Sequence, residues 1–184
     1  MTSKKSKKQT QEIIEYIRAP QKWLMTTRFK NNTWEENRAF LKKYPNIGCI
    51  YPALEPIAKT IPNNEILFVL EMNNDENRIM GIGMLKNRAI YEPGKYRVYS
   101  DSNYNRYTYL GKNRIDRTEM TEEEERIMKY FDIVCFTHSN HQKRLKGIKL
   151  FPPDIQFRCR KVLNMVSFIT NMFKSRKQNP TIQT

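Results

Sequence analysis

The chain has 184 residues, a length typical of one domain, and 39% of them are hydrophobic, which is enough for a buried core. It carries 33 lysines and arginines against 19 aspartates and glutamates, and the resulting net charge of +14 favours a polyanionic partner such as nucleic acid. Three cysteines without CxxC spacing argue against a disulfide framework, and no apolar run is long enough for a membrane helix. We therefore expect a soluble intracellular protein, cytoplasmic or nuclear.

The N-terminal part predicts a tail followed by short elements. Residues 1–9 (MTSKKSKKQ) are basic and polar with nothing to bury, so we expect them to be disordered. A helix over 10–18 and a short strand over 22–26 are predicted to follow. Thr33 and Glu36 have the spacing of a capping box, which predicts that a second helix begins at Thr33.

The sequence ILFVLEMNNDENRIMGIGM predicts a central β-hairpin. Two apolar runs, 66–70 and 79–85, flank a polar turn cluster at 72–77, which is the pattern of two strands joined by a turn. Gly81 and Gly83 interrupt the second run and would let a backbone, a helix or a flat ligand approach closely. We expect this hairpin to be buried at the centre of a small mixed α/β domain.

A tyrosine-rich, basic segment follows the hairpin, with strands expected on both sides of a polar loop at 100–105. Its tyrosines and cations are Tyr91, Tyr96, Tyr99, Tyr104, Tyr107 and Tyr109, interleaved with Lys95, Arg97, Arg106, Lys112, Arg114 and Arg117. Single-stranded nucleic acid is bound by cations that neutralise phosphates and by aromatic rings that stack on unpaired bases. This interleaving is the feature that most strongly predicts RNA binding.

The C-terminal part predicts two helices and a basic loop. A capping box at 121–124 begins the first helix, and the apolar run at 133–136 is either its end or a strand. The basic loop at 139–149 precedes a long helix over 154–174, and the tail over 175–184 is expected to be disordered. The apolar stripe of the long helix either belongs to the core or docks a protein partner.

No catalytic motif is found in the sequence. The GxG at Gly81 lacks the third glycine and the helix that a dinucleotide site needs. Cys135, His138 and His141, with Cys159 as a fourth ligand, form a metal-like set, but their spacing matches no standard zinc finger. We predict a protein that is not an enzyme and has no metal and no cofactor.

Several segments resemble YTH domains. The hairpin resembles the strand–turn–strand of that family, GCIYP at 48–52 falls where the family has its first cage tryptophan, and VYSDSNYNRYTYLGKNRI at 98–115 resembles the stretch with the second. KWLMTT followed by TWEE is similar to the start of EVE domains, which share the PUA-like fold. The resemblance covers 23–115 and implies a small mixed β-barrel sheet flanked by helices, with 10–174 forming one domain.

The resemblance also implies a function, an RNA-binding reader that stacks one modified, methylated nucleotide in an aromatic pocket. Tyr51 and Tyr99 match the two cage positions, although both are tryptophans in the family, so the ligand can differ from 6-methyladenine. The other expected nucleotide-binding residues are Trp34 and Tyr104, which would close the pocket, and Thr27 and Asn32, near the base edge. Phosphates would be held by Lys112, Arg114, Lys143, Arg144 and Lys146.

Two alternatives stay open. A capped mRNA end also carries a charged, methylated base, so a cap-binding translation factor would use the same rings. A basic protein that packages nucleic acid without base selection would show the same net charge. The sequence beyond Ile115 is similar in style and composition to proteins of large DNA viruses.

Overall fold

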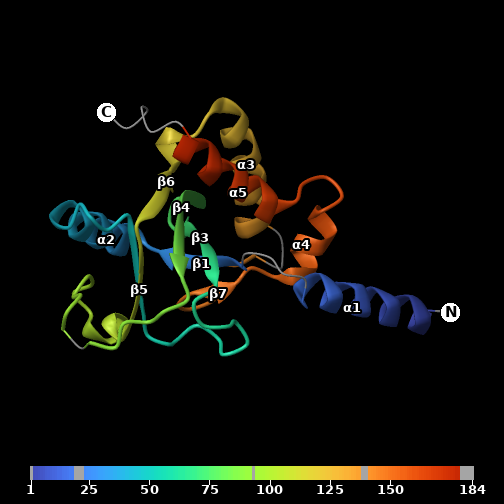
Figure 1. Ribbon diagram of the computed structural model, residues 1–184, viewed down its shortest axis with the longest axis horizontal. Helices are drawn as coiled ribbons and strands as arrows, with labels where there is room; N and C mark the ends of the chain where they lie inside the picture. Colours follow the sequence, from blue (N-terminus) through green and yellow to red (C-terminus); the bar gives the residue numbers. More distant parts are fainter. Residues whose placement is uncertain (1, 19–22, 93, 138–140, 179–184) are drawn as a thin grey trace. The chain divides into compact units, whose positions relative to one another are not determined.

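The structure is a computed structural model that describes residues 2–18, 23–92, 94–137 and 141–178 (Figure 1). The chain divides into two compact units, and the expected single domain over 10–174 stays a prediction. We call residues 24–149 the sheet unit and residues 1–23 with 150–184 the helical unit.

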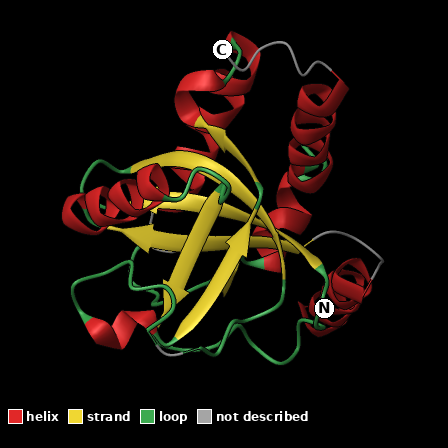
Figure 2. Ribbon diagram, turned by 60° about the vertical axis from the view of Figure 1, so that its left-hand side comes forward, coloured by secondary structure: helices red, strands yellow, loops and turns green. Residues whose placement is uncertain are grey.

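The sheet unit contains a five-stranded sheet with the strand order β6-β4-β3-β1-β7. Figure 2 shows the strands in yellow and the helices in red. Its strands are β1 (Trp23–Phe29), β3 (Ile66–Asn73), β4 (Arg78–Lys86), β6 (Asn113–Asp116) and β7 (Lys149–Leu150). Strands β3 and β4 pair antiparallel from Ile66↔Lys86 to Asn73↔Arg78, so the predicted hairpin is confirmed. Its turn ends at Asn77, whose φ of 52° lies in the left-handed region that asparagine tolerates.

A second, two-stranded sheet pairs β2 (Cys49–Ala53) antiparallel with β5 (Tyr107–Gly111), and Tyr51 faces Tyr109 in the register. The predicted α/β fold class is thus confirmed. The expected barrel is wrong, because over the described ranges the two sheets share no strand pairing and no barrel closes. Gly111 brings the sheets together, since a Cβ there would lie 2.2 Å from the Met84 carbonyl oxygen.

The helices of the sheet unit are α2 (Asn31–Lys43) and α3 (Glu122–Phe136). The capping box of α3 is confirmed, with the Glu124 amide donating to Thr121 Oγ1 at 3.2 Å, and the apolar run at 133–136 is the end of this helix. The capping box predicted for α2 is wrong. That helix begins two residues earlier, and the Thr33 hydroxyl accepts the Lys30 amide at 2.9 Å.

The helical unit contains α1 (Thr2–Arg18), α4 (Pro153–Cys159) and α5 (Met165–Gln178). Residues 2–9, expected to be disordered, continue the first helix. The single long helix expected over 154–174 is wrong. Asn164 provides a new N-cap, because its Oδ1 accepts the Ser167 amide at 3.0 Å. The first helix therefore ends at Cys159, and a second helix begins at Met165.

The apolar stripe of α5 is buried in the structure. Its buried members are Met165, Val166, Ile169, Met172 and Phe173. Across the described ranges, no helix combines the length and the apolar character that crossing a membrane would require.

Candidate functional site

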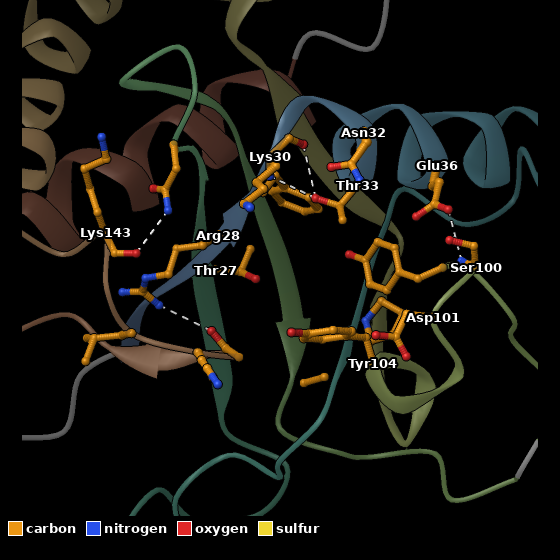
Figure 3. Close-up of a pocket in the computed structure, with 18 residues that line it drawn as sticks. Thr27, Arg28, Lys30, Asn32, Thr33, Glu36, Ser100, Asp101, Tyr104 and Lys143 are labelled. Carbon is orange, nitrogen blue, oxygen red and sulfur yellow. Dashed lines mark hydrogen bonds between the residues drawn. The ribbon is translucent and has the colours of Figure 1, made fainter.

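The sheet unit contains a cavity of about 390 Å³, which we call the inner pocket (Figure 3). Six segments form it: the end of β1, the start of α2, the end of β2, the turn after β3, the loop at 99–104 and the loop at 143–147. The side chains used in the argument below belong to Thr27, Arg28, Lys30, Asn32, Glu36, Asn74, Tyr99, Asp101, Tyr104, Lys143 and Lys146. The volume falls in the range of about 300–1,000 Å³ typical of small-molecule sites.

Strand β1 places Arg28 in the wall of the inner pocket. Its Nε donates to the Gln142 carbonyl at 2.6 Å, and its two terminal nitrogens donate to Gly147 O at 3.3 Å and to Thr26 Oγ1 at 2.7 Å. These bonds fix the loop at 143–147 against the strand. Burial lowers the pKa of Arg28 to about 10, so it stays a cation at neutral pH. Its hydrogen-bond partners are neutral oxygens, so they leave its charge uncompensated.

The loop at 99–104 is held in one conformation by its own polar groups. Asn105 Oδ1 accepts the amides of Val98 and Tyr99, both at 3.0 Å, and Asn105 Nδ2 donates to the Tyr99 carbonyl at 2.8 Å. The Ser100 amide donates to Glu36 Oε1 at 3.0 Å, which ties the loop to α2 (Figure 3). The loop therefore presents its tyrosines from a fixed backbone.

Tyr99 and Tyr104 differ in how much of each ring is accessible. Tyr99 is buried, and burial raises its pKa against the opposing hydrogen bond with Asn37, so its phenol stays neutral. Tyr104 is 41% exposed, and its ring faces the same space as Thr27 (Figure 3). Tyr104 is thus the ring that offers a face for stacking, and Tyr99 forms the wall beside it.

The charges around the inner pocket are distributed unevenly. Arg28 and Lys143 lie at one side, and Glu36 and Asp101 lie at the other, with Asp101 next to Tyr104 and Glu36 next to Ser100 (Figure 3). The Lys143 ammonium donates to Asn77 Oδ1 at 2.7 Å. Within the described part of the chain, neither Glu36 nor Asp101 has a lysine, arginine or histidine nitrogen within ion-pairing distance.

Six of the residues expected from the sequence line this one cavity, although they come from separate segments. They are Thr27, Asn32, Tyr99, Tyr104, Lys143 and Lys146. Four charged lining residues were not among the site residues expected from the sequence: Arg28, Lys30, Glu36 and Asp101. An arginine inside the apolar strand WLMTTRF was the available signal for Arg28.

The assignment of Tyr51 to the aromatic cage is wrong. Its side chain is fully buried, and its hydroxyl donates to Glu71 Oε1 at 2.7 Å. Gly83 makes room for that hydroxyl, since a Cβ at position 83 would lie 1.9 Å from it. The close approach allowed by this glycine therefore serves the protein's own side chain, and Tyr51 has no face left for a base.

The assignment of Arg114 to phosphate binding is also wrong. Its guanidinium donates to both carboxylate oxygens of Glu71 at 2.7–3.0 Å and to Asp116 at 2.7 Å. Burial alone would lower the pKa of Arg114, but the Glu71 carboxylate outweighs it and the pKa is raised. This guanidinium is committed to a buried ion pair.

Three further expected residues lie outside the inner pocket. Trp34 packs edge-on against Phe29 at 5.2 Å between ring centroids, and the Arg38 guanidinium covers it at 4.3 Å. Lys112 and Arg144 are exposed and do not line the cavity. Trp34 therefore does not close the pocket as the structure stands.

The described residues do not support a metal site at the set of cysteines and histidines singled out in the sequence. Cys135 is buried, and burial raises its pKa to about 12, so it stays a thiol. Outside the five stretches left undescribed, one of which contains His138, no three acidic, histidine or cysteine side chains cluster as a metal site would require.

Comparisons of the chain with protein-family models, with curated proteins and with solved structures find no match. The resemblance to YTH and EVE domains therefore stays a prediction that rests on the sequence segments quoted above.

Proposed function

We propose that the inner pocket binds one nucleotide of a single-stranded RNA, with a base-methylated nucleotide as the preferred ligand. The base stacks on Tyr104 beside the wall formed by Tyr99, and Lys30 and Lys146 hold the flanking phosphates. Arg28 adds an uncompensated positive charge at the phosphate side. The protein acts as a binding module and not as an enzyme.

The observation that carries this proposal is the meeting of stacking and phosphate-binding groups in one cavity. Tyr104 and Lys146 are 42 positions apart in the sequence, yet both line the inner pocket. Aromatic faces combined with lysines and arginines are the general means of holding single-stranded nucleic acid. Asn74 Oδ1 is buried in the wall with no hydrogen-bond partner among the described residues, so a small side-chain shift would offer it to a base or a ribose.

The test is a titration of short single-stranded RNAs, plain and base-methylated, at two salt concentrations. Tyr104→Ala should weaken binding of the preferred RNA by about 1–3 kcal/mol, the usual contribution of one stacked base. Tyr44→Ala removes a ring of similar exposure, 48% against 41%, away from the pocket and should bind as wild type.

Charge-matched variants complete the experiment. Lys146→Ala should reduce the slope of log K against log salt by about 0.7, the value for one phosphate on a single strand. Lys112→Ala, which removes an exposed lysine outside the pocket, should change the slope less. If Tyr104→Ala binds every RNA as wild type does and all RNAs weaken equally with salt, the protein is a non-selective packaging protein and the proposal fails.

A second candidate ligand is the cap nucleotide, favoured by the carboxylates of Glu36 and Asp101, which line the same pocket as the exposed ring of Tyr104. A 7-methylguanine is cationic, and unpaired carboxylates next to an aromatic face suit a cation. Glu36→Gln keeps an oxygen that can accept the Ser100 amide but removes the charge. It should therefore weaken binding of 7-methyl-GTP and leave GTP binding unchanged, whereas equal affinity of the wild type for both nucleotides would exclude the cap.

A further inference from the structure

A second hollow of about 510 Å³ lies in the sheet unit, and we call it the outer pocket. Its lining residues are Tyr91, Gly94, Tyr96, Arg97, Ser102, Asn105, Arg106 and Tyr107. The proposed function uses none of them to contact its nucleotide. Three of the tyrosines and two of the arginines of the interleaved segment therefore gather at a place separate from the inner pocket.

One ring of the outer pocket, Tyr91, is accessible in a way that core packing does not explain. Tyr91 is 66% exposed and stands edge-to-face against Tyr107, with ring centroids 5.6 Å apart and an angle of 87° between planes. Tyr109, in the same segment, has a structural role by contrast. Its ring is buried, and its hydroxyl accepts the Ile57 amide at 2.9 Å. Tyr91 offers an open aromatic face instead.

The charge of the outer pocket is positive. Arg97 and Arg106 are exposed, and the Arg106 side chain donates to the amide oxygen of Asn103 at 3.2 Å. The lining contains no aspartate or glutamate among the residues that the structure describes, in contrast to the inner pocket with its Glu36 and Asp101. Open rings with guanidinium groups and no carboxylate suit stacked bases and phosphates.

The two pockets share one loop, which separates them. Ser100, Asp101 and Tyr104 line the inner pocket, and Asn105 and its neighbours line the outer one. The divider between them is the single-turn 3₁₀ helix η1 (Ser102–Asn105). Consecutive residues of this helix, Tyr104 and Asn105, line different pockets, so the two pockets lie on either side of one short turn. A nucleic-acid strand leaving the inner pocket can therefore reach the outer pocket within a few nucleotides.

We propose that the outer pocket is a second binding site of this protein, which stacks a base of the same single strand a few nucleotides from the one in the inner pocket. Tyr91 provides the stacking face, and Arg97 and Arg106 neutralise the phosphates between the two bases. The inference rests on the proposed function, because it takes the inner-pocket nucleotide as the starting point of the strand.

The test compares a mononucleotide with a nine-nucleotide RNA that contains it, using calorimetry or fluorescence anisotropy. Tyr91→Ala should weaken binding of the nine-nucleotide RNA by about fivefold or more, the lower bound for loss of one stacked base, and leave mononucleotide binding unchanged. Tyr91→Phe keeps the ring and should bind both ligands as wild type. Replacing Arg97 and Arg106 together with alanine should lower the salt slope for the longer RNA by about 1.4.

The outcomes separate this inference from the proposed function. If Tyr104→Ala weakens both ligands while Tyr91→Ala binds the nine-nucleotide RNA as wild type does, the inner pocket holds a nucleotide and the outer-pocket site is refuted. If Tyr104→Ala leaves both ligands unaffected, the proposed function itself fails. An unchanged melting temperature of Tyr91→Ala, expected for so exposed a residue, shows that any loss of binding is not a loss of folding.

Discussion

Replacing Glu71 by glutamine should strongly destabilise the sheet unit. The Glu71 side chain is fully buried on β3, and it accepts the Tyr51 hydroxyl at 2.7 Å and the Arg114 guanidinium at 2.7–3.0 Å. Arg38 lies 3.6 Å away. Glutamine keeps the shape but removes the negative charge, which leaves two guanidinium groups with Asp116 as the nearest carboxylate.

The expected loss follows from the burial of the pair. Breaking a buried ion pair by removing one partner costs about 3–5 kcal/mol, because the other charge is left in a low-dielectric environment. A protein of this size loses about 2–4 °C in melting temperature per kcal/mol, so Glu71→Gln should melt about 6–20 °C below wild type.

Thermal and urea unfolding, followed by circular dichroism, measure this effect directly. Glu76→Gln provides the matched control, because Glu76 is an exposed carboxylate in the turn that follows the same strand. The control should melt within about 2 °C of wild type, as surface substitutions usually do. If Glu71→Gln melts as close to wild type as the control does, the buried ion pair does not stabilise the fold and the reasoning is refuted.

Three further predictions concern other buried or paired groups. Tyr51→Phe should lower the free energy of unfolding, measured with urea, by about 1.5–3 kcal/mol and leave RNA affinity unchanged. If the variant instead loses affinity and keeps its stability, Tyr51 belongs to the ligand site. The hydrogen bond from Arg117 lowers the pKa of Glu125 below its ordinary 4.5, so its contribution is present above that pH and is lost as pH falls through the folded value. Glu125→Gln should therefore flatten the stability–pH profile below pH 4.5, and an unchanged slope would contradict this. Burial raises the pKa of Cys49 and of Cys135 to about 12, so neither thiol should react with Ellman's reagent at pH 8 until the protein unfolds, and rapid native labelling of either would show that it is not buried.

Local patterns in the sequence were sufficient for several elements. The hairpin of β3 and β4 follows from two apolar runs around a polar turn, and the start of α3 follows from the Thr121–Glu124 capping box. These signals lie within one short stretch of sequence each, about four residues for the capping box and about twenty for the hairpin, so nearby residues determine them. The basic, tyrosine-rich composition likewise pointed to the segment that lines both pockets.

The tertiary structure alone decided what each tyrosine does. Tyr51, Tyr99, Tyr104 and Tyr109 look equivalent in the sequence, yet the first donates a hydrogen bond to a buried carboxylate, the second is a pocket wall, the third an open stacking face and the fourth a packed ring. Strand alternation divides residues between two faces but does not say which face is covered. Which face is covered depends on contacts between residues distant in the sequence, such as the contact of Tyr51 with Glu71. This contact is possible because Gly83 has no side chain that would collide with the Tyr51 hydroxyl.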